Sequence, residues 1–266
     1  MLGRALLREL SSETVAAPSS RDADLRNPAG VQAAIRDSRP DWIILAAAYT
    51  DVDGCESNRD LAFAVNCQGA VHVAEAARAN HSRLILVSTD YVFDGAGHRP
   101  YRAESPRCPI NVYGESKACA EERVGAVLTE ACIVRTSWLF GPGGRCFPAA
   151  IRRLAAEKPE LAVVNDQRGS PTFTVDLAAA VVKLCRADAQ GIVHATNSGD
   201  CTWYDFAREI VGQSGLSTSV RPVTTAEFPR PARRPAYSVL DPASLHARNI
   251  TMPSWQDALR RYLAIA

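Results

Sequence analysis

A tyrosine and a lysine four residues apart form the most specific chemical feature of this sequence. Tyr113 and Lys117 stand at the start of a predicted helix, where this spacing places both side chains on one face, about a turn apart. A phenol has an ordinary pKa of about 10, and a neighbouring ammonium lowers that pKa by favouring the phenolate. The pair therefore predicts a proton donor to the alkoxide that forms when a carbonyl is reduced. Chance occurrence in an amphipathic helix is the competing explanation.

Polar and small side chains follow two predicted strands at their carboxyl ends. Ser88, Thr89 and Asp90 come directly after the apolar run 84–87, and Ala47 and Ala48 follow the apolar run 41–45. Open α/β sheets bind their ligands at the carboxyl ends of the strands. Both groups are therefore predicted to line a ligand site, although strand termination and tight packing would explain the same residue types.

Predicted strands and helices alternate along the chain, which predicts an α/β fold with a doubly wound parallel sheet. The predicted strands are 14–17, 41–45, 84–87, 132–135, 161–164 and 191–195, and the predicted helices are 1–10, 28–38, 58–79, 113–127, 147–156, 175–185, one opening at 202–205, and 253–263. The basic, proline-rich stretch 229–235 is predicted to be a loop, because proline suits neither a helix interior nor a central strand.

The composition excludes several classes of function. At 266 residues, with 47% hydrophobic and 22% charged residues, the chain has the composition of an ordinary soluble globular protein. Its net charge of +1 argues against nucleic-acid or membrane-surface partners. No run approaches the ~20 apolar residues of a membrane helix. The eight cysteines form no C-x-x-C pair, which predicts no metal site and free, buried thiols in a reducing cytoplasm.

Eight ordered segments resemble the dTDP-4-dehydrorhamnose reductase family, a branch of the extended short-chain dehydrogenases/reductases. They are 46–53, 65–66, 88–95, 113–117, 135–138, 166–172, 203–206 and 233–235. The resemblance implies a Rossmann-like NAD(P)-binding domain in 1–140, its sheet partly completed by 161–195, and a smaller α/β substrate-binding region in 141–266. It also implies reduction of the 4-keto group of dTDP-4-dehydro-6-deoxy-L-mannose (dTDP-4-dehydrorhamnose) to dTDP-L-rhamnose, for a cell-surface polysaccharide.

The resemblance also assigns roles to individual residues. Thr89 would polarise the substrate carbonyl, Tyr113 would donate the proton, and Lys117 would bind the nicotinamide ribose and tune the tyrosine. Matched cofactor-binding positions, besides Tyr113 and Lys117, are Gly3, Asp24, Leu25, Ala47, Ala48 and Thr50, and matched substrate-binding positions are Thr89, Asp90, Trp138, Arg233 and Arg234.

Two of these substrate-binding assignments have structural alternatives. Trp138 is predicted to pack its indole on the hexose, and a core aromatic at a strand end is the alternative. Arg233 and Arg234 are predicted to neutralise the substrate diphosphate, because guanidinium groups suit phosphate oxygens. A solvated loop is the alternative for both arginines.

The first residues depart from the family pattern. Leu2, Gly3 and Arg4 resemble only the end of a glycine-rich phosphate-binding turn, so its strand and most of the turn, roughly a dozen residues, are expected to be absent. One hypothesis is an active reductase whose natural start lies upstream. The alternatives are a non-catalytic sugar-nucleotide-binding or regulatory homologue, and a reductase of another dTDP-linked deoxysugar. Retention of Thr89, Tyr113 and Lys117 favours the active reductase.

Two further positions bear on cofactors and assembly. Ala5 stands where many relatives have an acid, which argues against Mg²⁺ and a magnesium-linked dimer and leaves a homodimer of another kind open. No carboxylate follows the predicted strand 14–17 to accept the adenosine ribose hydroxyls. Arg21 stands there instead and suits a 2′-phosphate, so NADPH is expected in preference to NADH.

Overall fold

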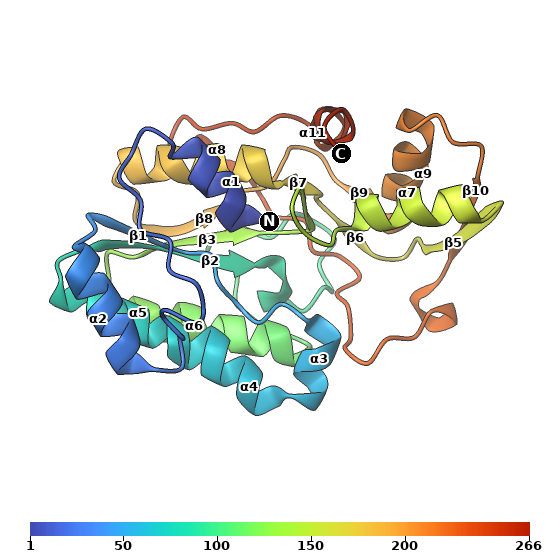
Figure 1. The fold of residues 1–266 in the computed structure, drawn as a ribbon. Coiled ribbons are helices and arrows are strands. Elements are labelled where there is room, and N and C mark those ends of the chain that lie inside the picture. Colours follow the sequence, from blue (N-terminus) through green and yellow to red (C-terminus); the bar gives the residue numbers. More distant parts are fainter.

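A four-stranded parallel sheet separates two layers of helices (Figure 1). The computed structural model describes residues 1–266, and its main sheet has the order β1-β2-β3-β8. These strands are β1 (Trp42–Leu45), β2 (Arg83–Thr89), β3 (Cys132–Thr136) and β8 (Gly191–His194), and all of their pairings are parallel. The predicted α/β fold is confirmed.

Successive residues of the central strands enter two different cores. Leu84 and Leu86 pack with α2 (Pro28–Ser38), α5 (Gly69–Ala79) and α6 (Val112–Val127), whereas Ile85 packs with α1 (Leu2–Glu9) and α8 (Thr174–Arg186) on the opposite face. Because helices cover both faces, these strands read as continuous apolar runs instead of alternating apolar and polar residues.

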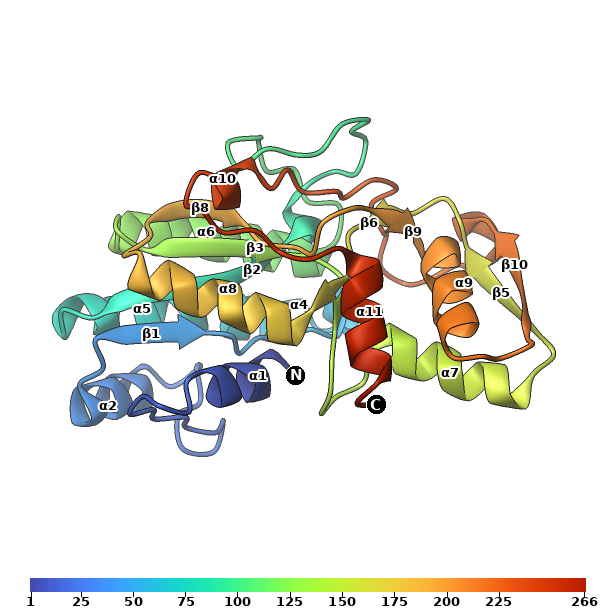
Figure 2. The same ribbon diagram turned by 90° about the horizontal axis from the view of Figure 1, so that it is seen from above.

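A smaller region lies at one end of the main sheet (Figure 2). There β5 (Glu160–Val164) pairs with β10 (Ser219–Val223), and aromatic residues of α7 (Phe147–Glu157), α9 (Trp203–Gln213) and α11 (Trp255–Leu263) contribute to a third core. Within the segment 161–195, α8 and β8 belong to the main sheet and its helix layer, whereas β5 belongs to the smaller region. The remaining elements are α3 (Val52–Ser57), α4 (Arg59–Phe63), η1 (Ala64–Gln68), η2 (Asp90–Val92), β4 (Leu139–Phe140), β6 (Arg168–Gly169), β7 (Thr172–Phe173), β9 (Cys201–Thr202), η3 (Thr225–Glu227) and α10 (Ala243–His246).

Two predicted elements differ from those observed. The predicted strand 14–17 is wrong, because these residues are exposed and pair with no strand, which leaves β1 at the edge of the sheet. The predicted helix 58–79 is divided into α4, a π-helical turn η1 and α5. The stretch 229–235 forms neither helix nor strand, as predicted. No helix combines the length and the apolar character needed to cross a membrane.

One disulfide corrects the prediction of eight free, buried thiols. Cys67 on η1 and Cys119 on α6 are bonded, with their Cα atoms 5.6 Å apart. These residues are separated by 52 positions and come together only because η1 packs against α6, which the sequence alone does not reveal. The other six cysteines are free, and Cys108 is exposed instead of buried.

A fully buried ion pair holds α6 against the sheet. The Glu121 carboxylate on α6 accepts hydrogen bonds from Arg135 Nε at 2.9 Å and Arg135 Nη2 at 2.6 Å, and from the Ser88 hydroxyl at 2.6 Å. The side chains of Glu121 and Arg135 are 0% and 1% exposed. Because Arg135 lies on β3 and Ser88 on β2, this network attaches α6, the helix that carries Tyr113 and Lys117, to both central strands.

We expect Arg135→Met to lower the free energy of unfolding by about 3 kcal/mol, because it removes both short hydrogen bonds from Arg135 to the buried Glu121 carboxylate and leaves only the longer contact with Arg107, at 3.4 Å. The double variant Arg135→Met/Glu121→Leu should lose less than the single variant. Urea denaturation measures both. Arg153→Met, which breaks the exposed pair with Glu157, is the control and should change stability by no more than about 0.5 kcal/mol. Additive losses in the double variant would contradict the dependence of the two charges on each other.

Candidate active site

The predicted catalytic residues meet where β2 ends and α6 begins. Thr89 is the last residue of β2, and its hydroxyl donates to Asp90 Oδ1 at 3.0 Å and accepts from the Tyr91 amide at 3.2 Å. Tyr113 lies in the first turn of α6. Thr89 and Asp90 both lie close enough to its hydroxyl to shift the pKa of Tyr113. Lys117, one turn later, donates from Nζ to the Val87 carbonyl of β2 at 2.7 Å.

The start of α6 is fixed by a cap and by a close backbone approach. Asn111 is the N-cap, and its Oδ1 accepts from the Gly114 amide at 2.8 Å. A Cβ on Gly114 would collide with the carbonyl oxygen of Tyr91, so only glycine lets α6 approach η2 this closely. This contact brings the Tyr113 phenol to the end of β2.

The pKa of Tyr113 is raised, which contradicts the predicted lowering by Lys117. Burial is the main cause, the Asp90 carboxyl raises the pKa further, and a hydrogen bond with Thr89 opposes them. The Lys117 ammonium is directed to the Val87 carbonyl, and burial lowers its own pKa to about 8, with Glu121 opposing that shift. Tyr113 is therefore a protonated phenol at neutral pH, which is the form that a proton donor requires.

Asp90 presents an unsatisfied carboxyl oxygen at the same place. Its side chain is buried, and burial raises the pKa of Asp90 to about 7, although hydrogen bonds with Ser238 and Thr89 lower it. Its Oδ2 has no hydrogen-bond partner in the protein. A buried polar atom without a partner is costly, so this oxygen is suited to accept a hydroxyl from a ligand.

Asn66 on η1 secures the turn that carries the predicted cofactor residues. Its Oδ1 accepts from the Tyr49 amide at 2.7 Å, and its Nδ2 donates to the Tyr49 carbonyl at 3.0 Å and to Ser116 Oγ on α6 at 2.9 Å. In the secured turn, Ala47 and Thr50 are exposed and Ala48 is half-buried. The sequence analysis included Asn66 in a matched segment but assigned it no role. No local sequence signal indicates the π-helical turn, which directs the Asn66 side chain to a loop 17 positions earlier in the chain.

The predicted positions for the other end of the cofactor lie near α1 and α2. Gly3 is exposed in the first turn of α1, no side chain caps that turn, and a Cβ there would meet nothing within 4 Å. Free first-turn amides are suited to a phosphate. The Leu25 carbonyl accepts from His72 Nδ1 at 2.8 Å, whereas Arg26 already engages the Asp24 carboxylate and lowers its pKa to about 2.

The Trp138 indole is anchored in the smaller region. It stacks on Trp203 with ring centroids 3.5 Å apart and planes 7° apart, and a Cβ on Gly169 would collide with it. Trp138 is half-buried against the third core, so one face of the ring is not free for a hexose. The stacking partner Trp203 was not predicted as a site residue.

The structure separates the two predicted diphosphate arginines. Arg234 Nη1 donates to Asp53 Oδ1 at 2.8 Å, and its side chain is only 15% exposed. Arg233 is exposed, and its guanidinium has no partner within the protein. Of the two, only Arg233 carries an unpaired charge.

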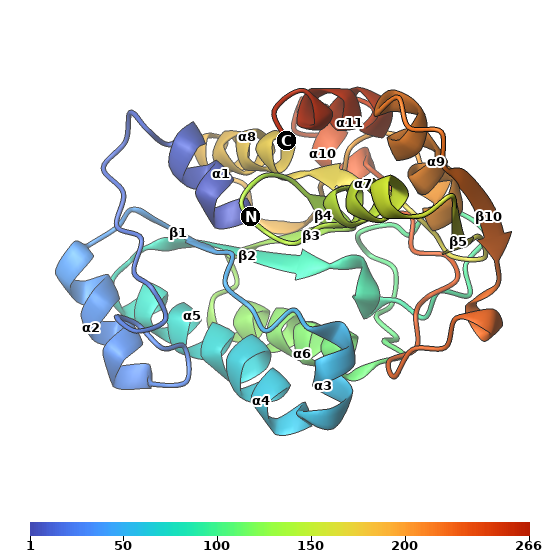
Figure 3. The same cartoon turned by 45° about the vertical axis from the view of Figure 1, so that its right-hand side comes forward.

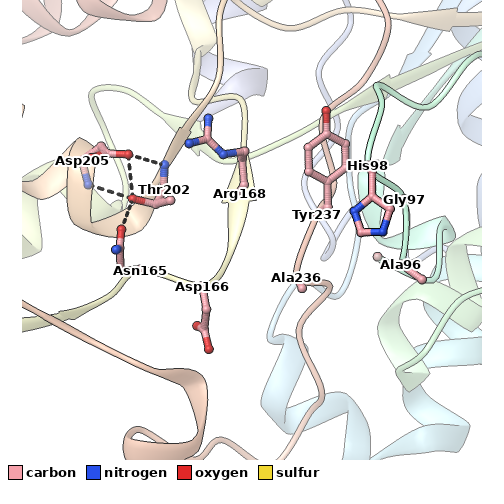
Figure 4. A pocket seen from close by; sticks show the side chains of 11 residues that line it. Ala96, Gly97, His98, Asn165, Asp166, Arg168, Thr202, Asp205, Ala236 and Tyr237 are labelled. Atoms are coloured by element: carbon pink, nitrogen blue, oxygen red, sulfur yellow. Dashed lines mark hydrogen bonds between the residues drawn. The ribbon is translucent and has the colours of Figure 1, made fainter.

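A polar cleft of about 670 Å³ lies beside β6 (Figure 4). Arg168 and Tyr237 line it, whereas their neighbours Gly169 and Ser238 contact Trp138 and Asp90. Its charged groups are already engaged, since Arg168 pairs with Asp200 and Asp205 belongs to the capping box of α9. None of the predicted site residues lines this cleft.

Known proteins resemble the whole chain. The family described as RmlD substrate binding domain matches residues 1–266. The chain is 42% identical over 254 residues to dTDP-4-dehydrorhamnose reductase from Mycobacterium tuberculosis, a match that covers 92% of this chain and 83% of that protein. The chain belongs to the dTDP-4-dehydrorhamnose reductase family.

Two further relatives extend the comparison. Spore coat polysaccharide biosynthesis protein SpsK from Bacillus subtilis is 40% identical over 264 residues, covering 98% of this chain and 93% of SpsK. The crystal structure of dTDP-4-dehydrorhamnose reductase from Bacillus anthracis in complex with NADP matches with a TM-score of 0.97 and 38% identity, covering 100% of this chain and 95% of that one. The fold of a dTDP-4-dehydrorhamnose reductase is thus present over the full chain described above.

We expect Asp90→Asn to stabilise the protein more at pH 8 than at pH 5.5. Burial raises the pKa of Asp90 to about 7, so the folded state binds this proton more tightly than the unfolded state, and the ionised group costs stability as pH rises through that range. The gain should be about 2 kcal/mol larger at pH 8, at about 1.36 kcal/mol per pKa unit.

Urea denaturation at the two pH values measures this difference. Asp94→Asn is the matched control, because the hydrogen bond from Tyr101 lowers the pKa of Asp94 and keeps it ionised at both pH values. Its effect should be the same at pH 5.5 and pH 8. A pH-independent effect of Asp90→Asn would contradict the raised pKa.

Proposed function

We propose that this protein reduces the 4-keto group of dTDP-4-dehydrorhamnose to dTDP-L-rhamnose, using NADPH. The observation that carries the proposal is the convergence of Thr89, Asp90 and Tyr113 at the end of β2, with Lys117 on the same face of α6. The 42% identical relative from Mycobacterium tuberculosis is a dTDP-4-dehydrorhamnose reductase, which supports this substrate. Retention of all these side chains in one site favours an enzyme over a non-catalytic binding protein.

The residues of this site suit a carbonyl reduction in which charge develops on oxygen. A nicotinamide bound at this site would supply the hydride to C4 of the sugar. The Thr89 hydroxyl redirects its hydrogen bond from Asp90 Oδ1 to the carbonyl oxygen. Tyr113 transfers its phenolic proton to that oxygen, which becomes the product hydroxyl. Tyr113 is left as a phenolate and regains its proton from solvent. Lys117 is cationic below its pKa of about 8 and favours that phenolate electrostatically.

The surrounding residues fit the sugar nucleotide and the cofactor. Asp90 Oδ2 accepts a sugar hydroxyl, and the exposed part of Trp138 flanks the hexose. For the cofactor, Lys117 would bind the nicotinamide ribose, and the turn with Ala47, Ala48 and Thr50 would line the cofactor. Gly3 leaves the first turn of α1 open to a phosphate, and Asp24 and Leu25 would contact the adenine. This protein acts in the cytoplasm, without Mg²⁺ and as a homodimer or a monomer.

We expect Tyr113→Phe to lower kcat by about 10²–10⁴-fold with little change in KM, because the variant retains the ring and loses only the transferable proton. Oxidation of NADPH at 340 nm with the 4-keto sugar nucleotide measures the rate, and NMR identifies the product. Tyr262→Phe is the control, since it removes a buried hydroxyl that contacts Cys146 in the third core. Full activity of Tyr113→Phe would overturn the assignment of the proton donor.

We expect a higher kcat/KM with NADPH than with NADH, and an effect of Arg21→Ala on NADPH alone. Arg21 is exposed and its guanidinium has no partner in the protein, so it is free to bind a 2′-phosphate. The variant should lower kcat/KM for NADPH about tenfold, the size of one charged hydrogen bond, and leave NADH unchanged. Arg8→Ala, an exposed residue at the end of α1, is the control. Equal losses with both cofactors, or a preference for NADH, would contradict this role.

A further inference from the structure

Residues 229–238 form a strap that follows η3 and crosses the site. The strap contains no helix or strand, and its end is joined to Arg168 of β6 by an isolated bridge at Tyr237. In Figure 3 the orange chain after β10 descends toward α3. We propose that Asp53 is the positioning residue that holds this strap in place, so that the Arg233 guanidinium is free for the diphosphate of the sugar nucleotide. This inference rests on the proposed function, because it assumes that a nucleoside diphosphate is the substrate.

Asp53 binds the strap at three residues. Its Oδ2 accepts from Arg230 Nε at 2.9 Å, and its Oδ1 accepts from the Ala232 amide at 3.2 Å and from Arg234 Nη1 at 2.8 Å. The Asp53 side chain is 17% exposed. Burial alone would raise its pKa, but the hydrogen bonds from Arg234, Ala232 and Arg230 hold the pKa of Asp53 at about 2. We call the Asp53 carboxylate with its three contacts to the strap the clamp. Because of this low pKa, the Asp53 carboxylate is ionised at neutral pH.

The rest of the strap is held by residues that surround the proposed catalytic groups. Asn111, the N-cap of α6, donates from Nδ2 to the Arg233 carbonyl at 2.8 Å. A Cβ on Gly95 would collide with Pro235, and the Tyr237 amide donates to the Gly95 carbonyl at 3.1 Å. Ser238, the last residue of the strap, lies close enough to Asp90 to lower the pKa of its carboxyl. The strap thus runs from the segment after β1, past the start of α6, to the end of β2.

The charges of the strap suit a dianionic group. The strap holds three arginines, of which Arg230 and Arg234 pair with the single carboxylate of Asp53, so the strap and Asp53 together carry two positive charges. A diphosphate within a sugar nucleotide carries two negative charges. Because Arg230 and Arg234 are tied to Asp53, the backbone on both sides of Arg233 is fixed while its own guanidinium is left without an acidic partner. Asp53 acts on the substrate only through that arrangement.

The test compares Asp53→Asn with Arg233→Ala and with the double variant. We expect each single variant to raise KM for the sugar nucleotide about tenfold while kcat changes less than twofold, because one charged contact to the substrate is lost or misplaced. The KM of the double variant should be no higher than that of Arg233→Ala alone, since Asp53 acts through Arg233. Asp53→Glu should restore part of the affinity. Asp188→Asn, which breaks an ion pair with Arg83, is the control.

Calorimetric titration with dTDP provides a second measurement that does not require turnover. The same variants should bind dTDP about tenfold more weakly than the wild type, and thermal melting checks that each is folded. An unchanged KM and Kd for Asp53→Asn, a loss confined to kcat, or additive effects in the double variant would overturn the inference. Absence of turnover by the wild type with intact dTDP binding would contradict the proposed function and leave the role of Asp53 to be decided by the binding data.

Discussion

The buried ion pair between Glu121 and Arg135 is the interaction on which the arrangement of the site depends. Glu121 lies one turn beyond Lys117 on α6. Besides binding Arg135, its carboxylate accepts a hydrogen bond from the hydroxyl of Ser88, the neighbour of Thr89. Tyr113, Lys117 and Glu121 follow one another at four-residue intervals, so the face of α6 that carries the chemistry is the face that is tied to the sheet. Any displacement of the helix would therefore break a network that water does not reach, which gives the site its rigidity.

Burial gives this site an electrostatic character that charge spacing alone does not predict. The sequence places an ammonium one turn from a phenol, and the expected result is a lowered pKa of Tyr113. In the fold, burial and the Asp90 carboxyl raise the pKa of Tyr113, and Lys117 donates to the Val87 carbonyl instead. Burial also raises the pKa of Asp90, so both groups favour their protonated forms. The lysine is meanwhile shifted toward neutrality. At pH 7 the site therefore holds a protonated phenol one helical turn from a lysine that is still mostly cationic.

Local patterns predicted what depends on local physics. The apolar runs of β2 and β3, the helix opening at 202–205 and the four-residue spacing on α6 all belong to single elements, and each was found where it was expected. The features that were missed join distant segments: the Asn66 contact to Tyr49, the Cys67–Cys119 bond and the clamp at Asp53. The strand predicted at 14–17 failed for the same reason, because a strand exists only where a neighbour pairs with it.

The strap 229–238 has a consequence for the motions of the protein. Between Pro229 and Pro235 it contributes to no sheet ladder, so its opening breaks side-chain contacts to Asp53 and Asn111 and leaves the hydrogen bonds of the main sheet intact. Segments of this kind open at a free energy well below that of global unfolding. Three prolines restrict the backbone in the open form, which lowers the conformational entropy lost when the strap returns. Amide hydrogens of the strap can therefore exchange with solvent faster than those of β2 and β3, which remain protected.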